Sequence, residues 1–308
     1  MTVIIAFVAN LLVAVAKTIA ALLTGSASMI AESAHSWADT GNQIFLLLAE
    51  KKSKKKRDKA HPMGYGREAY VWSMFAAFGL FTAGAVVSIM HGVQQIFAPE
   101  PAGDFGIAYA VLAAAFVLEG VSFIQAFRQA RKAARDLDRN TLEQVLKSSD
   151  PTLRAVFAED SAALIGLVIA FGGIFLHQVT GSPLPDAAGS ILVGLLLGVV
   201  AVVLIDRNRR FLVGQGVSPD IEESMGRRIL EHAEIERITY LHVEFVGPRK
   251  LYVVAAVDMT GDRPEREVAV ALRRIERDLE DHDTVEEAVL TLATLDEPSL
   301  TFGAGSSR

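Results

Sequence analysis

An apolar segment near the start of the chain, residues 28–48, carries ionisable side chains along its middle. The polar residues are spaced three or four positions apart, so on a helix they share one face: Glu32, His35, Asp39 and Asn42. One ionisable group at the centre of a bilayer costs about 2.5–3.5 kcal/mol on insertion scales. The segment therefore reads as a membrane helix whose polar face must line a bundle interior or a cavity.

His35 and Asp39 lie four residues apart and offer an imidazole nitrogen and a carboxylate oxygen to one point in space. Zinc accepts both ligand types at roughly 2.0–2.2 Å and takes four ligands in a tetrahedron. The pair predicts half of a metal site. The alternative is a buried histidine–aspartate hydrogen bond that fixes helix packing.

The chain combines 51% hydrophobic with 21% charged residues, which is too many charges for a protein wholly embedded in lipid. Its long apolar runs end near residue 206. We expect a six-helix membrane domain over 1–206, a soluble domain over 207–297 and a disordered tail over 298–308. Because the chain has no cysteine, disulfides and thiolate metal sites are excluded, and any metal sits on nitrogen and oxygen ligands.

Apolar segments long enough to cross about 30 Å of hydrocarbon recur along the first 206 residues. They predict transmembrane helices at 3–23, 28–48, 69–97, 105–127, 152–177 and 186–205. Lys17, in the first of them, is expected to snorkel or to pair within the bundle.

The charges of the connecting loops predict the orientation of these helices. Lys and Arg gather at 51–59, 128–147 and 207–210, whereas the connections at 24–27, 98–104 and 178–185 contain none. By the positive-inside rule, both termini are cytoplasmic in an integral protein of the cell (inner) membrane. The basic loop 51–59 lies too close to the bilayer for a nucleic-acid site, so we expect no nucleic-acid partner.

A second polar cluster, Glu159 and Asp160, lies in the segment 152–177. Adjacent residues on a helix point 100° apart, so only one of them faces a given centre. We expect Asp160 to point inward, with Glu159 as a second ligand or a proton carrier. The alternative is a carboxylate paired with Arg154. Glu119, near Ser122 in the segment 105–127, forms a weaker polar pair.

The soluble domain shows an αββαβ pattern. Ser218 and a following proline begin a helix to about 233, and a second amphipathic helix covers 264–282. Alternating runs predict strands at 238–246, 251–259 and 285–294. The expected fold class is an α-helical membrane protein followed by a cytoplasmic α+β, ferredoxin-like domain with its helices on one sheet face.

Together these features resemble the cation diffusion facilitator family of divalent-metal/proton antiporters, in its zinc-transporter-like branch. The resemblance covers about residues 3–297, and its most specific matches are the stretch from Gly25 to Asp39 and residues 61–68. It implies export of Zn²⁺ in exchange for protons by a homodimer, paired through the membrane and cytoplasmic domains within the lipid bilayer. The alternatives are transport of Mn²⁺, Fe²⁺ or Co²⁺, and a membrane protein that binds metal without transporting it.

The resemblance also implies a transport site built from two residue pairs on the second and fifth helices. His35 and Asp39 match the first pair and Asp160 the later member of the second. Val156 stands where zinc-transporting members usually carry histidine, and Glu159 would supply the missing ligand. Carboxylate in place of imidazole shifts the site toward harder ions such as Mn²⁺ or Fe²⁺.

Other residues have roles around this site. We expect Glu32 and Asn42 to support the metal ligands or to carry protons. An intramembrane metalloenzyme with Glu32 as general base is a rival interpretation, but the chain has no His-Glu-x-x-His motif, so we expect no enzyme activity.

Two further expectations rest on the resemblance alone. Asp58 and His61 match an accessory metal site, but Tyr65 replaces its second histidine, so that site is expected to be weak or lost. Arg67 and Asp206 match a charge pair near the dimer interface. The soluble domain lacks the histidines that bind zinc in several relatives, which indicates a metal-free dimerisation domain.

Overall fold

The computed structural model describes residues 2–99, 104–135 and 140–302. The chain divides into two compact units: residues up to Glu50 together with Ala69–Arg209, and Lys51–Glu68 together with the chain from Arg210 onward. The expected boundary after residue 206 lies close to Arg210. The expected domains did not assign the loop 51–68 to the second unit.

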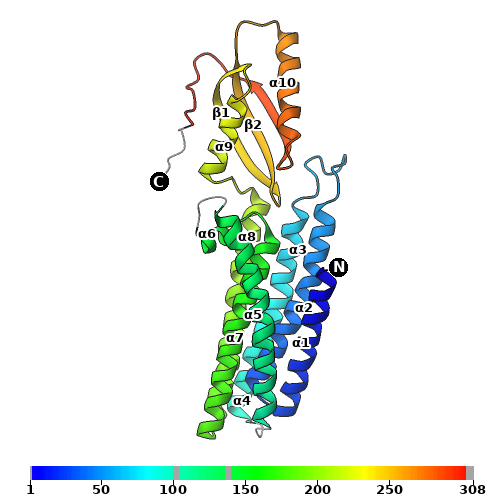
Figure 1. Ribbon diagram of the computed structural model, residues 1–308, viewed down its shortest axis with the longest axis vertical. Helices are drawn as coiled ribbons and strands as arrows, with labels where there is room; N and C mark the ends of the chain where they lie inside the picture. Colours follow the sequence, from blue (N-terminus) through cyan, green and yellow to red (C-terminus); the bar gives the residue numbers. More distant parts are fainter. Residues whose placement is uncertain (1, 100–103, 136–139, 303–308) are drawn as a thin grey trace. The chain divides into compact units, whose positions relative to one another are not determined.

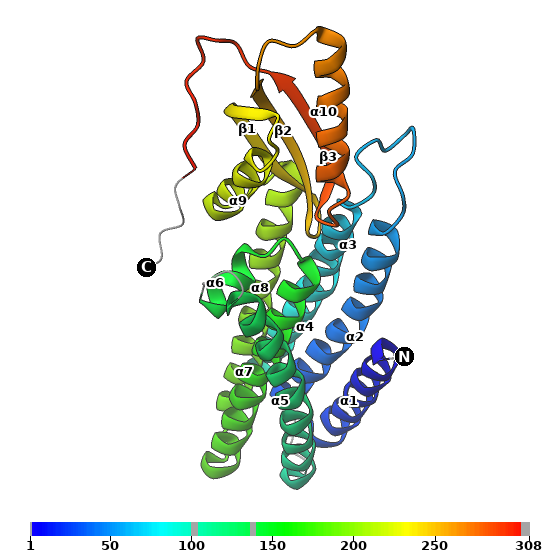
Figure 2. The same cartoon turned by 45° about the horizontal axis from the view of Figure 1, so that its top comes forward.

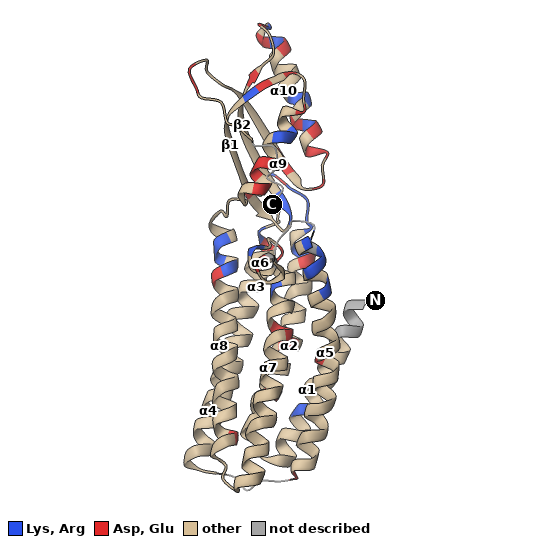
Figure 3. Ribbon diagram, turned by 60° about the vertical axis from the view of Figure 1, so that its left-hand side comes forward, with Lys and Arg blue, Asp and Glu red and all other residues tan. Residues whose placement is uncertain are grey.

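The first unit is a bundle of long helices that run side by side (Figure 1). Its elements are α1 (Thr2–Thr24), α2 (Ala27–Ser53), α3 (Glu68–Ala76), the π-helical turn η1 (Ala77–Phe81), α4 (Thr82–Phe97), α5 (Phe105–Arg135), α6 (Thr141–Lys147), α7 (Pro151–Thr180) and α8 (Leu184–Val213). The segment predicted as one helix at 69–97 is thus interrupted by η1. Figure 3 shows Lys and Arg gathered at one end of the bundle and few charges along its length.

Among the described residues, five helical stretches are long and apolar enough to span a membrane. They are Phe7–Thr24, Glu68–Phe97, Phe105–Lys132, Pro151–Thr180 and Leu184–Val213. Helix α2 is long enough but is not among them, because the polar residues in its middle make it less apolar. The chain is an integral membrane protein, and the sixth crossing stays a prediction.

Two apolar clusters hold the bundle together. One joins α1, α2, α5 and α7 around Met29, Leu112 and Leu167, and the other joins η1, α4, α7 and α8 around Phe81 and Leu197. Many of the remaining members are alanines, which let helices approach closely in a membrane bundle. Helix α7 belongs to both clusters, so it is packed on α2 and α8 at once.

The second unit contains a three-stranded sheet with the predicted element order. Its elements are α9 (Pro219–Leu230), β1 (Ile235–Gly247), β2 (Lys250–Met259), α10 (Glu265–Glu280) and β3 (Val285–Leu292). The strand order is β1-β2-β3, with β1 antiparallel and β3 parallel to β2. The αββαβ order is as predicted, and the ferredoxin-like classification stays a prediction.

Burial along the central strand explains where the helices lie. Every second residue of β2 is buried, from Leu251 to Met259, and the residues between them are only partly covered. Helices α9 and α10 lie on one side of the sheet (Figures 2 and 3). One face of the sheet therefore forms the core of this unit. The other face is open within the described chain.

The outer edge of β1 is covered by other parts of the chain. Residues 215–217 pair with the backbone of Val243 and Phe245, and Leu300 N donates to Ile238 O at 2.8 Å. Leu300, in the tail expected to be disordered, is thus hydrogen-bonded to β1. Residues 303–308 lie outside the described part of the chain.

The outer edge of β3 is covered by two glutamates one turn apart on α10. Oε1 of Glu276 accepts from Leu290 N at 2.8 Å, and Oε1 of Glu280 accepts from Ala288 N at 3.1 Å. Side-chain carboxylates here take the place of a neighbouring strand. Covered edges are a usual means of preventing strand addition by another chain.

Candidate metal site

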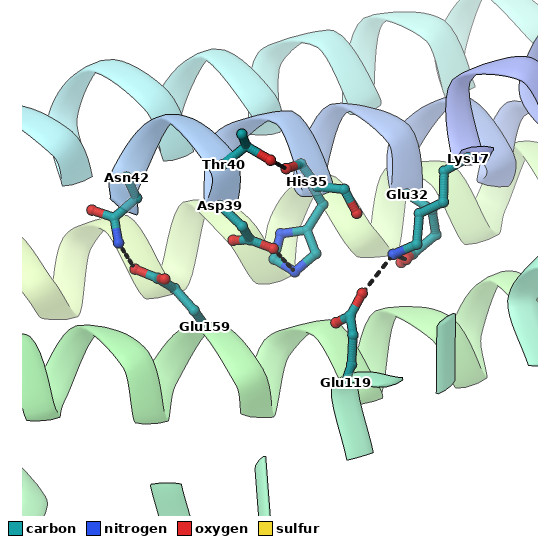
Figure 4. A network of polar contacts seen from close by, with 9 residues as sticks. Lys17, Glu32, His35, Asp39, Thr40, Asn42, Glu119 and Glu159 are labelled. Carbon is teal, nitrogen blue, oxygen red and sulfur yellow. Dashed lines mark hydrogen bonds and ion pairs between the residues drawn. The ribbon is translucent and has the colours of Figure 1, made fainter. Parts of the chain in front are cut away.

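The polar face of α2 is buried inside the bundle (Figure 4). Glu32 is 0% exposed, His35 and Asn42 are each 1% exposed, and Asp39 is 8% exposed. The large apolar residues Ile44 and Leu47 on the same helix are exposed. The helix thus keeps its ionisable groups away from the surface that lipid would contact.

An aspartate from α8 fixes the start of α2. The carboxylate of Asp186 accepts from Ser26 Oγ at 2.9 Å, from Ala27 N at 2.8 Å and from Ser28 N at 3.1 Å. The first backbone N–H groups of a helix have no partner within the helix, and Asp186 caps them from another helix. A Cβ on Gly189 would lie 2.6 Å from Ser28 Oγ, so glycine is needed for this approach. The joint sets the position of α2 against α8.

His35 and Asp39 lie beside each other without a hydrogen bond. Nε2 of His35 is 3.5 Å from Oδ2 of Asp39. Within the described structure, neither ring nitrogen of His35 nor Oδ1 of Asp39 has a hydrogen-bond partner. Leaving buried polar atoms unsatisfied costs about 1–3 kcal/mol each. The pair therefore leaves buried polar atoms available to a ligand, which favours a binding site over a packing contact.

Helix α7 presents Glu159, and not Asp160, to α2. Glu159 is buried and its Oε1 accepts from Asn42 Nδ2. Asp160 is partly exposed, and its Oδ2 accepts from Ser122 Oγ on α5 at 2.9 Å. Asp160 was expected to be the inward group, and in this conformation Asn42 of α2 contacts Glu159 instead; which of the two serves as the metal ligand stays a prediction. Adjacent residues point 100° apart, and the amide of Asn42 engages the first of the two carboxylates.

The alternative pairing with Arg154 is also not what the structure shows for these carboxylates. Arg154 Nη1 donates to Ser148 O, and its Nη2 donates to Asn208 Oδ1 at 2.7 Å. Among the described residues, no group of three or more His, Asp or Glu side chains is placed to hold a metal ion. The predicted set of His35, Asp39, Glu159 and Asp160 is not assembled in this conformation, and its role as a ligand set stays a prediction.

Next to His35 along α2 lies an ion cluster that sequence reasoning did not assemble. Lys17 Nζ on α1 lies 2.9 Å from Glu32 Oε2 on α2 and 2.8 Å from Glu119 Oε1 on α5, and the lysine side chain is 0% exposed (Figure 4). The isolated charges at 17 and 119 inside apolar segments were the only signal in the sequence. The predicted pairing of Lys17 within the bundle is confirmed.

In the loop 51–68, Asp58 organises the backbone. Its Oδ1 accepts from Ala60 N at 3.0 Å and His61 N at 2.9 Å, and Tyr65 OH donates to its Oδ2 at 2.7 Å. The hydrogen bond from Tyr65, followed by that from His61 N, lowers the pKa of Asp58 to about 2. The ring of His61 lies against that of Tyr65, with centroids 4.0 Å apart. Both Asp58 oxygens are engaged, and the accessory metal site of Asp58 and His61 stays a prediction.

The two members of the expected interface charge pair each contact another residue. Arg67 Nη2 donates to Glu244 Oε1 at 3.0 Å within the second unit. Asp206 Oδ1 accepts from Arg209 Nη2 at 3.0 Å within the first. The pairing of Arg67 with Asp206 stays a prediction.

Known proteins match this chain over most of its length. Residues 3–213 match the cation efflux transmembrane domain. The Xenopus laevis protein named mitochondrial proton-coupled zinc antiporter SLC30A9 is 35% identical over 245 residues, which are 80% of this chain and 44% of that protein. Metal tolerance protein C4 of Arabidopsis thaliana is 33% identical over 76% of this chain and 51% of its own length.

A bacterial relative is matched over more of its length. Zinc transporter ZitB of Escherichia coli strain K12 is 24% identical over 90% of this chain and 82% of that protein. The chain spans about half the length of the first two relatives. The match to the cation efflux transmembrane domain, residues 3–213, includes the helices that carry the buried polar face.

Proposed function

The chain belongs to the cation efflux, or cation diffusion facilitator, family, and we propose that it moves a divalent metal cation, zinc in the first place, across a membrane in exchange for protons. The observation that carries the proposal is the buried pair of His35 and Asp39. Both ring nitrogens of His35 and Oδ1 of Asp39 lack hydrogen-bond partners among the described residues. A bound cation would satisfy these atoms, and the names of the relatives from Xenopus and Escherichia coli support zinc.

We assign Glu159 and Asp160 on α7 as the groups that complete the ligand set. In the present conformation each has another partner, Asn42 and Ser122 respectively. A small rotation or shift of α7 against α2 would exchange these hydrogen bonds for a metal ion. Because three of the four ligands are carboxylates, Mn²⁺, Fe²⁺ and Co²⁺ are the alternative substrates. Glu32 and Asn42 then orient the ligands or accept protons.

Protons complete the cycle in this proposal. A metal ion requires neutral histidine and ionised carboxylates, so metal binding releases protons and protonation releases the metal. A proton gradient directed against the metal flux would then drive efflux. With α2 as the sixth crossing, the basic loops and both termini lie on the cytoplasmic side of the cell membrane. Two copies would pair as a homodimer.

Zinc flux in liposomes tests the proposal. The purified full chain is reconstituted with a zinc-sensitive dye inside the vesicles and an opposing pH gradient. His35→Ala and Asp39→Ala are expected to reduce flux to that of protein-free vesicles. His177→Ala is the matched control, because it removes another buried histidine of the bundle that contacts the ring of Phe105.

The outcomes separate a carrier from the alternatives. Wild-type flux from both His35→Ala and Asp39→Ala would remove the proposed site. Stoichiometric zinc binding without flux in the wild-type protein would favour a membrane protein that binds metal without transporting it. Repeating the assay with Mn²⁺, Fe²⁺ and Co²⁺ identifies the preferred ion.

A further inference from the structure

The ion cluster of Lys17, Glu32 and Glu119 holds a cation inside the bundle. The ammonium of Lys17 lies between one oxygen of each carboxylate, at 2.9 and 2.8 Å. The three side chains come from α1, α2 and α5, so no single helix creates the arrangement. Two carboxylates that converge on one positive charge offer oxygen ligands that zinc and other divalent cations accept in proteins.

The cluster is continuous with the proposed transport site. Glu32 precedes His35 by three residues and shares the polar face of α2. Along that face, Asn42 lies nearest to the basic loop, and His35 and Glu32 follow toward the end of the helix at Ala27. An ion that leaves His35 and Asp39 in the direction of Ala27 therefore next meets the carboxylate of Glu32.

One oxygen of Glu32 is not used by Lys17. Oε1 is buried and has no hydrogen-bond partner in the described structure. It points to α7 at Gly166, where an added Cβ would lie 2.5 Å away. Gly166 follows Glu159 by seven residues, or about two helical turns, so both lie on the same face of α7. Oε1 of Glu32 thus lies at the same interface between α2 and α7 as the side chains of Asp39 and Glu159.

This placement indicates that the cluster does more than hold helices together. The inference of such a role rests on the proposed function. We propose that Glu32 and Glu119 form a second site for the divalent cation, and that the ammonium of Lys17 fills this site whenever the metal is elsewhere. The metal moves from His35 and Asp39 to the two carboxylates as the ammonium leaves. The lysine stem is flexible and stays attached to α1, so the same ammonium returns once the ion has gone.

Charge makes the two occupants mutually exclusive. A divalent cation and an ammonium repel each other strongly at contact distance in a medium of low dielectric constant. With Lys17 present, the second site therefore holds metal only briefly and the ion is released. Without that charge, the two carboxylates would be left with no positive partner, and they would retain a metal ion instead.

The test counts Zn²⁺ ions bound to the purified full chain by equilibrium dialysis against zinc. Lys17→Met keeps an unbranched side chain of similar length and removes the charge. It is expected to bind one more Zn²⁺ per chain than the wild-type protein and to transport zinc more slowly, because the ion is held. Adding Glu32→Gln or Glu119→Gln to Lys17→Met is expected to abolish the additional binding.

A structural lock without any role in metal passage predicts different results. In that case Lys17→Met binds no more zinc than the wild-type protein, and this result would overturn the inference. If Lys17→Met does not fold in metal-free buffer, the inference predicts that Zn²⁺ restores its monodisperse elution and helical circular dichroism. A failure of zinc to restore the fold would overturn it as well.

The two proposals fail in distinguishable ways. Loss of the proposed function appears as absent zinc flux in the wild-type protein. Failure of the present inference appears as an equal number of Zn²⁺ ions bound per chain in the wild-type protein and in Lys17→Met. The second comparison is made on bound metal alone, so it gives an answer whether or not the wild-type protein transports zinc.

Discussion

The amide of Asn42 on α2 donates to the carboxyl oxygen Oε1 of Glu159 on α7, across 117 positions of sequence. It is a direct polar link between the two helices that the proposed function assigns to metal binding. Asp39 lies one helical turn from Asn42 on α2, so the link brings Glu159 close to Asp39. It also gives the buried carboxyl group a partner when no metal is bound.

Removal of this link should destabilise the bundle. Asn42→Leu leaves the Glu159 carboxyl buried without its donor, and we expect a loss of about 1–3 kcal/mol in the free energy of unfolding. Thermal unfolding in detergent measures the change. Ser122→Ala is the control, because it removes a donor to the partly exposed Asp160 and should cost less. Equal effects of the two substitutions would contradict the assignment of Glu159 as the inward carboxylate.

Two glycines of α7 provide a matched pair of substitutions that test the interface between α2 and α7. A Cβ at Gly166 would lie 2.5 Å from Glu32 Oε1, whereas a Cβ at Gly172 has nothing within 4 Å. Gly172→Ala should stabilise the helix by about 0.5–1 kcal/mol. Gly166→Ala should displace the Glu32 carboxylate and lower both stability and zinc flux. A Gly166→Ala protein with wild-type flux would show that Glu32 does not need its present position.

The hydrogen bonds between Asp186 and the start of α2 should weaken when one acceptor oxygen is removed, and the protein should become less stable. Asp186→Asn keeps a single carbonyl oxygen for the donors Ser26, Ala27 and Ser28. We expect a loss of about 1–2 kcal/mol, typical for removal of a good helix cap. Asp262→Asn removes an equal charge at an exposed position and should leave the unfolding temperature unchanged. Similar behaviour of both variants would argue against the cap.

In the second unit, Gly226 and Phe302 form a testable contact. A Cβ on Gly226 would lie 2.3 Å from the Phe302 ring, so Gly226→Ala should displace Phe302 from α9 and lower stability. In the Phe302→Ala background the same substitution should be neutral or stabilising, because the obstacle is gone. A double-mutant cycle of unfolding free energies measures the coupling. An additive cycle would show that the segment 298–302 does not rest on α9.

The loop aspartate gives a prediction in pH. Because hydrogen bonds from Tyr65 and His61 N hold the pKa of Asp58 at about 2, the ionised carboxylate favours the folded loop. That contribution is present above the ordinary pKa of about 3.9 and is lost as the pH falls toward 2. Tyr65→Phe removes the largest cause and should raise the Asp58 pKa toward 3.9, as measured by a carboxyl carbon NMR titration.

The control for this titration is His61→Ala, which keeps the backbone N–H donor. The pKa of Asp58 should then stay well below its ordinary value. If Tyr65→Phe leaves the titration of Asp58 unchanged, the hydrogen bond from the tyrosine is not what orders this loop.

The sequence predicted those features that depend on local spacing. The face of Glu32, His35, Asp39 and Asn42 follows from intervals of three and four, and the αββαβ order follows from alternation and turn residues. In both cases a single segment contains all the necessary information. The observed elements differ from the expected ones at their ends, at the η1 turn and in the additional short helix α6.

The features that were missed depend on contacts between distant segments. Glu159 is hydrogen-bonded to Asn42 on another helix, and the partners of Lys17 lie on α2 and α5. The π-helical turn at Ala77–Phe81 adds a residue to one turn of a helix that looks continuous in sequence. None of these is visible in the periodicity of one helix.

When a helix is held at one end and tilts, its residues move farther the more distant they are from that end. With Ala27 held by Asp186, a tilt of about 5° in α2 would displace Glu32 by roughly 0.7 Å and Asn42 by roughly 2 Å, given a rise of about 1.5 Å per residue. The hydrogen bond between Asn42 and Glu159 would break under such a tilt, while the contact of Glu32 with Lys17 would survive. In such a tilt the contacts of α2 farthest from Ala27 would break first, and those near the clamp would break last.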